Sequence, residues 1–143
     1  MKKYLILMVL AFCSPMVAAE VHLRVEGAWI QAVPPGIHET AIFMVLVNPG
    51  PEPVRIVGGT TPVAKRVTPM LTTKEDGRMG MKDVSFFEVP SGGRVILRPG
   101  GDHLMVYGLK KNLQAGETVS LVLQLRPGGQ VSLEVPVSRT PPQ

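Results

Sequence analysis

The stretch VSLVLQLRPGGQVSLEVPV, residues 119–137, decides the fold class. Val or Leu occupies every second position in both halves of this stretch, and side chains two residues apart on a strand point to the same face of a sheet. The turn-forming sequence RPGG, residues 126–129, separates the two halves. The stretch therefore predicts a β-hairpin with one buried face, formed by residues 119–125 and 131–137.

Short apolar segments separated by turn sequences continue outward from this hairpin. The further segments are 22–33, 40–47, 54–57, 63–67, 94–97 and 103–107. The sequence EDG, residues 75–77, predicts a second hairpin between residues 71–73 and 79–81. The chain also contains 15 Gly and 14 Pro, about a fifth of its residues, which favours many turns over a helical bundle. Eight or nine short strands at this spacing predict an all-β, Greek-key β-sandwich.

The 143 residues leave room for one domain behind an export signal. Lys2 and Lys3 precede the apolar run 4–12, and the small residues Val17-Ala18-Ala19 form a cleavage pattern, so residues 1–19 are predicted to be a secretory signal. The mature chain would begin at Glu20 in the periplasm. It would comprise a β-sandwich domain, residues 20–137, and a flexible tail, residues 138–143.

Two other fates of the leader compete with cleavage. An uncleaved transmembrane anchor is disfavoured because the apolar run is short and a cleavage pattern follows it. Lipidation at Cys13 is disfavoured because the bulky Phe12 occupies a position that normally requires a small residue. The mature chain is accordingly expected not to insert into a membrane.

Removal of the leader changes both the charge and the chemistry of the chain. Loss of Lys2 and Lys3 lowers the formal net charge from +4 to +2, and no basic run remains, so nucleic acid is a poor candidate partner. The single cysteine, Cys13, also lies in the leader. The mature chain therefore lacks a thiol for a disulfide, a redox pair, a thiolate zinc site or a blue-copper centre.

The methionines of the mature chain are Met44, Met70, Met79, Met81 and Met105. The most informative stretch is HLM, residues 103–105, because His103 and Met105 should share one face of a strand. Leu104 and Val106 are natural core residues, so His103 and Met105 are expected to face outward. Met79 and Met81 repeat this spacing. Met44 is expected in the core, and Met79 could serve either packing or metal binding.

Thioether sulfur is a soft, neutral ligand that favours Cu(I), and imidazole adds a borderline donor. Zinc sites normally use thiolate, several histidines or carboxylate, so this residue set argues for Cu(I), with Ag(I) as a chemical mimic. The chain shows no nucleophile elbow, paired-carboxylate motif or phosphate-binding loop, so an enzyme is disfavoured. Asp102 is expected to shape the turn before His103, and His38 to be exposed without a partner.

The spacing of these residues resembles the motif of the periplasmic PCuAC-type copper chaperones, the DUF461 family, written His or Met, x10, Met, x21, His-x-Met. Ten residues separate Met70 from Met81, and twenty-one separate Met81 from His103. The flanking sequences EDG at 75–77, VPSGG at 89–93 and LRPGGDHLM at 97–105 are also similar. The resemblance covers about residues 21–137.

The resemblance implies a cupredoxin-like β-sandwich with a surface-exposed Cu(I) site. The implied ligands are Met70, Met81, His103 and Met105. It further implies delivery of copper to the binuclear centre of cytochrome c oxidase subunit II, often alongside a Sco-type protein, and we expect a monomer. A nitrous-oxide-type enzyme or an efflux route remains open as the recipient. A metal-free or copper-buffering assembly module of the envelope is the alternative function.

Two features of this chain stand apart from the motif. Many family members carry His at the position of Met70, so a site with three thioethers and one imidazole is expected to favour Cu(I) more strongly. Cleavage after Ala19 would also create an amino-terminal sequence Glu20-Val21-His22, which can wrap Cu(II) or Ni(II) in a square plane. An exposed His22 without metal is the favoured interpretation of that sequence.

Overall fold

The computed structural model describes residues 22–143 as ten β-strands, without a helix in that range. The strands are β1 (Arg24–Gln31), β2 (Glu39–Val47), β3 (Val54–Thr60), β4 (Ala64–Glu75), β5 (Arg78–Asp83), β6 (Phe87–Val89), β7 (Arg94–Leu97), β8 (His103–Leu109), β9 (Thr118–Arg126) and β10 (Gln130–Ser138). The all-β prediction is confirmed, although β6 was not expected. Within the described range, no helix is available that could cross a membrane. The leader, with Cys13 and its cleavage pattern, lies outside the described residues.

Strands β9 and β10 form the hairpin predicted from residues 119–137. Leu123 pairs with Val131, Leu121 with Leu133, and the register continues along both strands. The alternate residues 119, 121, 123 and 125 of β9 are each at most 2% exposed, so one face of the hairpin contributes to the core. Burial of this regular apolar face favours the register, because a slip of one residue would turn the face toward solvent.

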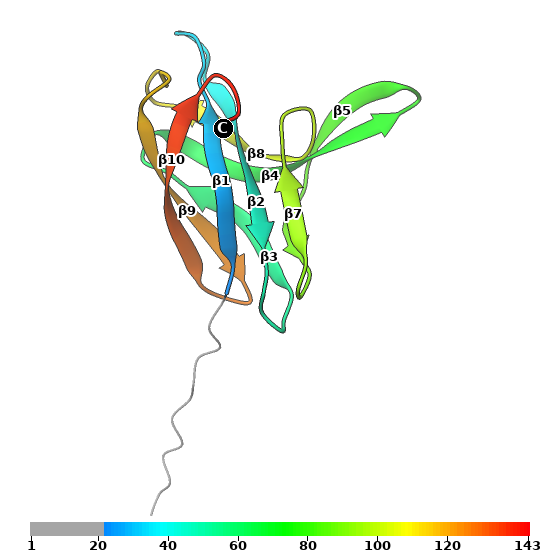
Figure 1. The fold of residues 1–143 in the computed structure, drawn as a ribbon. Coiled ribbons are helices and arrows are strands. Elements are labelled where there is room, and N and C mark those ends of the chain that lie inside the picture. Colours follow the sequence, from blue (N-terminus) through cyan, green and yellow to red (C-terminus); the bar gives the residue numbers. More distant parts are fainter. Residues whose placement is uncertain (1–21) are drawn as a thin grey trace, which may run out of the picture.

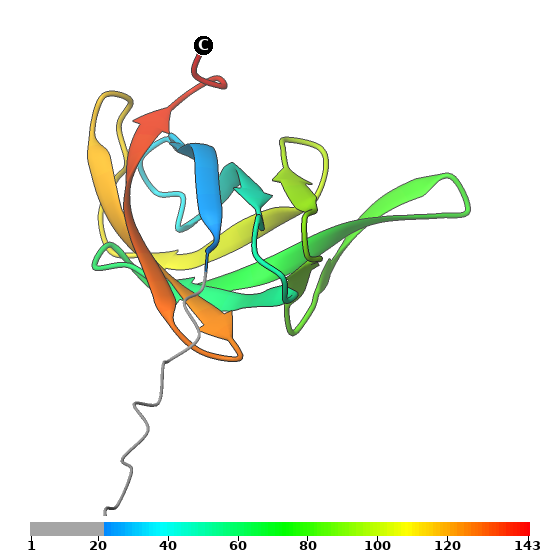
Figure 2. The same cartoon turned by 60° about the horizontal axis from the view of Figure 1, so that its bottom comes forward.

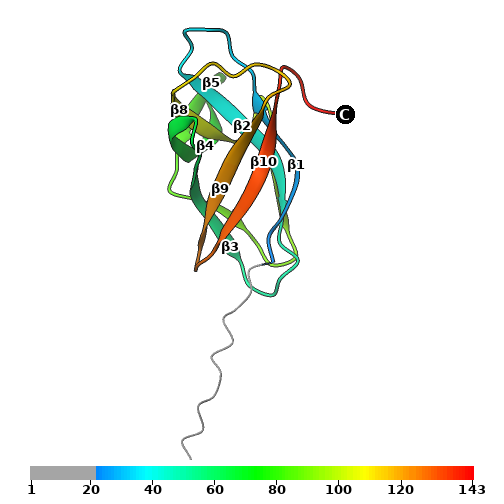
Figure 3. The same cartoon turned by 90° about the vertical axis from the view of Figure 1, so that its left-hand side faces the viewer.

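The sheet closes on itself as a barrel. Its order is β5-β4-β8-β2-β1-β10-β9-β3-β6, and β3 pairs again with β4. The strands from β4 round to β3 therefore form a continuous wall, with β1 and β10 adjacent and parallel (Figures 2 and 3). Closure removes most free strand edges. The interior is filled by buried apolar side chains, including Met44 at 2% exposure, which confirms its predicted core position.

The second predicted hairpin is present and projects from the barrel (Figure 1). Asp76 and Gly77 both have positive φ values, 50° and 75°, as a tight hairpin turn requires. The expected segments 63–67 and 71–73 belong to one strand, β4, so Met70 lies within this strand and not near a strand end. Pro69 does not break β4, since its carbonyl still accepts a hydrogen bond from the Val84 amide at 3.2 Å.

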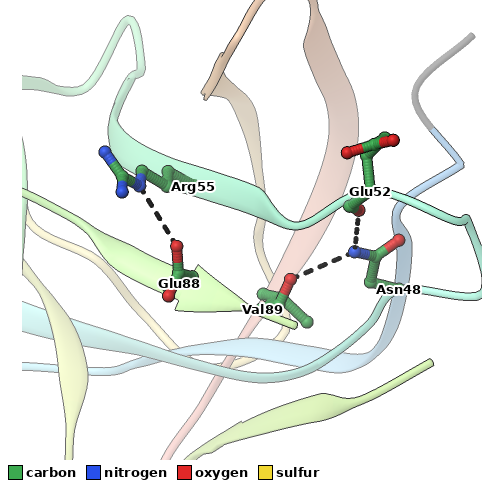
Figure 4. Close-up of polar contacts among 5 residues, drawn as sticks. All are labelled: Asn48, Glu52, Arg55, Glu88 and Val89. Atoms are coloured by element: carbon green, nitrogen blue, oxygen red, sulfur yellow. Dashed lines mark hydrogen bonds and ion pairs between the residues drawn. The ribbon is translucent and has the colours of Figure 1, made fainter. Parts of the chain in front are cut away.

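At the far end of β2, Asn48 joins three segments of the chain (Figure 4). Its side chain is 1% exposed, and Nδ2 donates to the carbonyls of Glu52 at 2.7 Å and Val89 at 3.0 Å. Its Oδ1 accepts from the Gly50 amide at 3.0 Å. These bonds hold the β2–β3 turn against β6, while Arg55 and Glu88 form a more exposed ion pair nearby. Asn48 is therefore a satisfied structural residue at one end of the barrel.

Candidate metal centre

Strand β8 carries His103 and Met105 on the face that points away from the barrel core. Leu104, which lies between them, and Val106, which follows Met105, are fully buried in the core cluster. This confirms the prediction that alternate residues of this strand face the core and the outside. His103, however, is only 6% exposed. The expectation of an exposed imidazole is wrong, because the ring lies near Phe43, with ring centroids 6.3 Å apart, and beneath the β7–β8 turn.

The backbone fixes how the His103 ring can act. Its Nδ1 lies 3.0 Å from the carbonyl oxygen of Gly101, which can only accept a hydrogen bond. In the neutral ring this contact favours the proton on Nδ1 and leaves the lone pair of Nε2 for a metal. The Thr72 hydroxyl donates to the same carbonyl at 2.6 Å, so β4 also helps to position the imidazole.

Asp102 shapes the turn that precedes His103, as the sequence predicted. Its carboxylate Oδ1 accepts from the Thr72 amide at 3.0 Å, and its backbone carbonyl accepts from the Arg98 amide at 3.0 Å. In both hydrogen bonds the donor is a backbone amide. Asp102 therefore fastens the β7–β8 turn to β4.

Strand register brings the widely spaced motif residues onto one surface. Met70 of β4 pairs with His103 on β8 and with Asp83 on β5. Met81 of β5 pairs with Thr72, two residues further along β4. Directly paired residues project to the same face of a sheet. Strand β4 pairs with β5 on one side and with β8 on the other, so all four motif residues lie on adjacent strands.

A groove of about 680 Å³ lies over these strands. It is lined by Gln31, Val33, Glu39, Thr40, Ala41, Phe43, Thr72, Met79, Gly80, Met81, Pro99, Gly100, Gly101, His103 and Met105. Three motif residues, Met81, His103 and Met105, therefore line one groove together with Met79. Met70 is 7% exposed and lies outside this lining, so it is the least exposed of the three motif methionines. His38 is exposed and does not line the groove.

Phe43 lines the groove and packs against a second aromatic side chain, Trp29. Trp29 and Phe43 are paired across β1 and β2 with ring centroids 4.8 Å apart, and both are at most 5% exposed. Together with Met70, they are the buried apolar residues that do not belong to the core cluster of the described chain. Sequence reasoning missed this aromatic pair. The unbroken apolar run of β2, which is typical of a strand covered on both faces, was the available signal.

The donors in the groove are chemically soft. Within residues 22–143, no group of three or more His, Cys, Asp or Glu side chains could hold a metal ion. Hard cations require several oxygen ligands, and structural zinc requires thiolates or several imidazoles. Thioethers beside one imidazole instead match the preferences of Cu(I).

Comparison with known proteins gives a consistent family relationship. The model of the LpqE-like family, described as "Putative lipoprotein LpqE-like", matches residues 23–137. "Putative lipoprotein Lxx21020" of Leifsonia xyli subsp. xyli (strain CTCB07) is 34% identical over 116 residues, which are 80% of this chain and 69% of that protein.

Solved structures agree with the fold. The copper-bound PCuAC domain from PmoF2 is 20% identical, with a TM-score of 0.70 over 85% of this chain and 97% of that domain. The solution structure of the Cu(I) form of DR1885 from Deinococcus radiodurans is 35% identical, with a TM-score of 0.67 over 87% and 83% of the two chains. The cupredoxin-like fold is thereby confirmed. The chain belongs to the LpqE-like family and has the fold of the PCuAC domains.

Proposed function

We propose that this protein is a periplasmic carrier of Cu(I), held by Met70, Met81, His103 and Met105. The observation that carries the proposal is the convergence of Met81, Met105 and the His103 ring on one groove, with the His103 Nδ1 already engaged by Gly101. Met70 is the fourth donor because it pairs with His103 across neighbouring strands. Binding by Met70 would require its buried side chain to turn toward the groove, which it does not line.

The similarity to DR1885, solved as its Cu(I) form, supports copper as the cargo. A site of neutral ligands suits a carrier, since thioethers bind Cu(I) without releasing a proton and give it up by ligand exchange. The exposed strand β5 lines one part of the groove, so a ligand from a recipient can approach the ion there. We place the protein among copper carriers and not among enzymes for this reason.

In this proposal the protein acts as a monomer and delivers Cu(I) to the binuclear copper centre of cytochrome c oxidase subunit II. A Sco-type protein would act alongside it. Export to the cell envelope is supported by the leader sequence and by the description of the family as lipoproteins. The proposal includes removal of the leader by cleavage after Ala19.

Anaerobic titration tests copper carriage directly. Wild-type protein is expected to take up one equivalent of Cu(I) in competition with a chromogenic chelator, because the groove offers one convergent donor set. Mixing the loaded protein with the apo copper domain of oxidase subunit II should then move the copper, followed by NMR of both proteins. Failure to bind Cu(I) would favour the metal-free assembly module, and binding without transfer would favour another recipient.

The variant Met70→His tests the role of the fourth donor. Imidazole is harder than thioether, so the variant is expected to bind Cu(II) more tightly relative to Cu(I) and to lose copper more readily in acid. Paired Cu(I) and Cu(II) competition titrations measure this preference. An unchanged preference would show that residue 70 is not a ligand. Met44→Leu, a change within the core, provides the matched control.

A further inference from the structure

Met79 is exposed in a way that packing does not explain. Met79 and Met81 lie two residues apart on β5, so their side chains project to the same face. They are 64% and 67% exposed, the highest values among the exposed large apolar residues of the described chain. All six residues of β5 are exposed, and this edge strand pairs with β4 on one side. Exposed methionine forgoes the stabilisation that burial would provide. Met79 is therefore available for a role other than core packing.

The position of Met79 relative to the groove suggests that role. Met79 lines the same groove as Met81, His103 and Met105. It also lines an adjoining hollow at the tip of the hairpin, together with Thr73, Glu75, Asp76, Arg78 and Gly80. Along β5, Met79 thus lies nearer the hairpin turn than Met81 does. This hairpin projects from the barrel (Figures 1 and 2). Met70, in contrast, is buried away from the groove surface.

We infer that Met79 is a further copper ligand and forms, with Met81, an outer thioether pair through which Cu(I) reaches and leaves the inner donors His103 and Met105. This inference rests on the proposed function and adds a route to it. Methionine side chains have three rotatable bonds and can follow an ion across a short distance. Exchange of one thioether for another keeps the metal as Cu(I) and releases no proton, so the transfer needs no additional reactant.

Methyl-group NMR tests this inference in the whole mature protein. With the methionine methyl carbons labelled by ¹³C, stepwise addition of Cu(I) should move the Met79 signal along with those of Met81 and Met105. Met44 lies in the core at 2% exposure and should not move, which makes it an internal control. If Met81 and Met105 move while Met79 keeps its copper-free position, the outer pair is wrong and the proposed carrier function stands. If none of the three moves, both are wrong.

Transfer kinetics provide a second, independent measurement. Met79→Leu removes the sulfur but preserves the size of an exposed side chain, so the fold should be maintained. We expect Cu(I) transfer to a chromogenic chelator to slow several-fold, with a smaller change in the equilibrium affinity. Met81→Leu should instead lower the affinity, and Met44→Leu should change neither quantity. A Met79→Leu protein that transfers copper at the wild-type rate would overturn the proposed route.

Discussion

The double variant His103→Gln/Met105→Leu is expected to lose at least about 100-fold in Cu(I) affinity. Loss of a residue that only hydrogen-bonds to a metal ligand already commonly lowers metal affinity about 10- to 100-fold, and this variant removes two ligands. Gln can still form a hydrogen bond near the Gly101 carbonyl but lacks a borderline imidazole donor. Leu conserves much of the volume of Met without its sulfur. The pair thus removes two donors of the groove while largely preserving its packing. Competition against a chromogenic Cu(I) chelator measures the loss.

Two controls separate loss of ligands from loss of structure. His38→Gln changes an exposed histidine outside the groove and should leave Cu(I) affinity unchanged. Thermal unfolding of the copper-free double variant should remain cooperative. A folded double variant with wild-type Cu(I) affinity would place the metal elsewhere, and the amino-terminal sequence ending at His22 would then be the next site to examine.

Asn48→Ala is expected to lower the free energy of unfolding by about 3 kcal/mol, which corresponds to a fall in Tm on the order of 10 °C. The change removes a side chain that is 1% exposed and makes three hydrogen bonds to the backbone. The carbonyl of Val89 then loses a partner in a buried environment, which costs more than an exposed hydrogen bond. Urea denaturation of the copper-free protein measures the effect.

The exposed Asn112 provides a matched control for this substitution. Asn112→Ala should change stability by less than about 0.5 kcal/mol, as is usual for surface positions. Cu(I) affinity should be retained in folded Asn48→Ala protein, because Asn48 and the groove lie toward opposite ends of β2. Equal stability of the two alanine variants would contradict the structural role assigned to Asn48.

The sequence predicted the elements of the fold whose signals are local. The hairpin of β9 and β10 followed from alternation, and the turn at Asp76 and Gly77 followed from residues that tolerate positive φ. The continuity of β4 was not predicted, because a proline normally interrupts a strand ladder. Pro69 is accommodated through its carbonyl and through neighbours distant in the sequence. Such compensation has no local signal.

The candidate site shows the same division between local and tertiary information. The shared face of His103 and Met105 follows from strand periodicity alone. The burial of His103 depends on Phe43 and on the β7–β8 turn, which reach it from other parts of the chain. Thr72 was also missed, although it contacts both Gly101 and Asp102. Its role depends on register between strands that are separated by about thirty residues.

The direction in which β1 runs has a consequence for a membrane tether. β1 starts beside the Asn48 end, where His22 lies near Gly50, and finishes at Gln31 on the groove. If the leader were lipidated at Cys13 and not cleaved after Ala19, the lipid would hold the barrel by the end that carries Asn48, away from the groove. The chain from Cys13 to His22 can span at most about 30 Å. A molecule tethered in this way would present the groove away from the bilayer, an orientation that suits the proposed carriage of copper to a membrane-bound recipient.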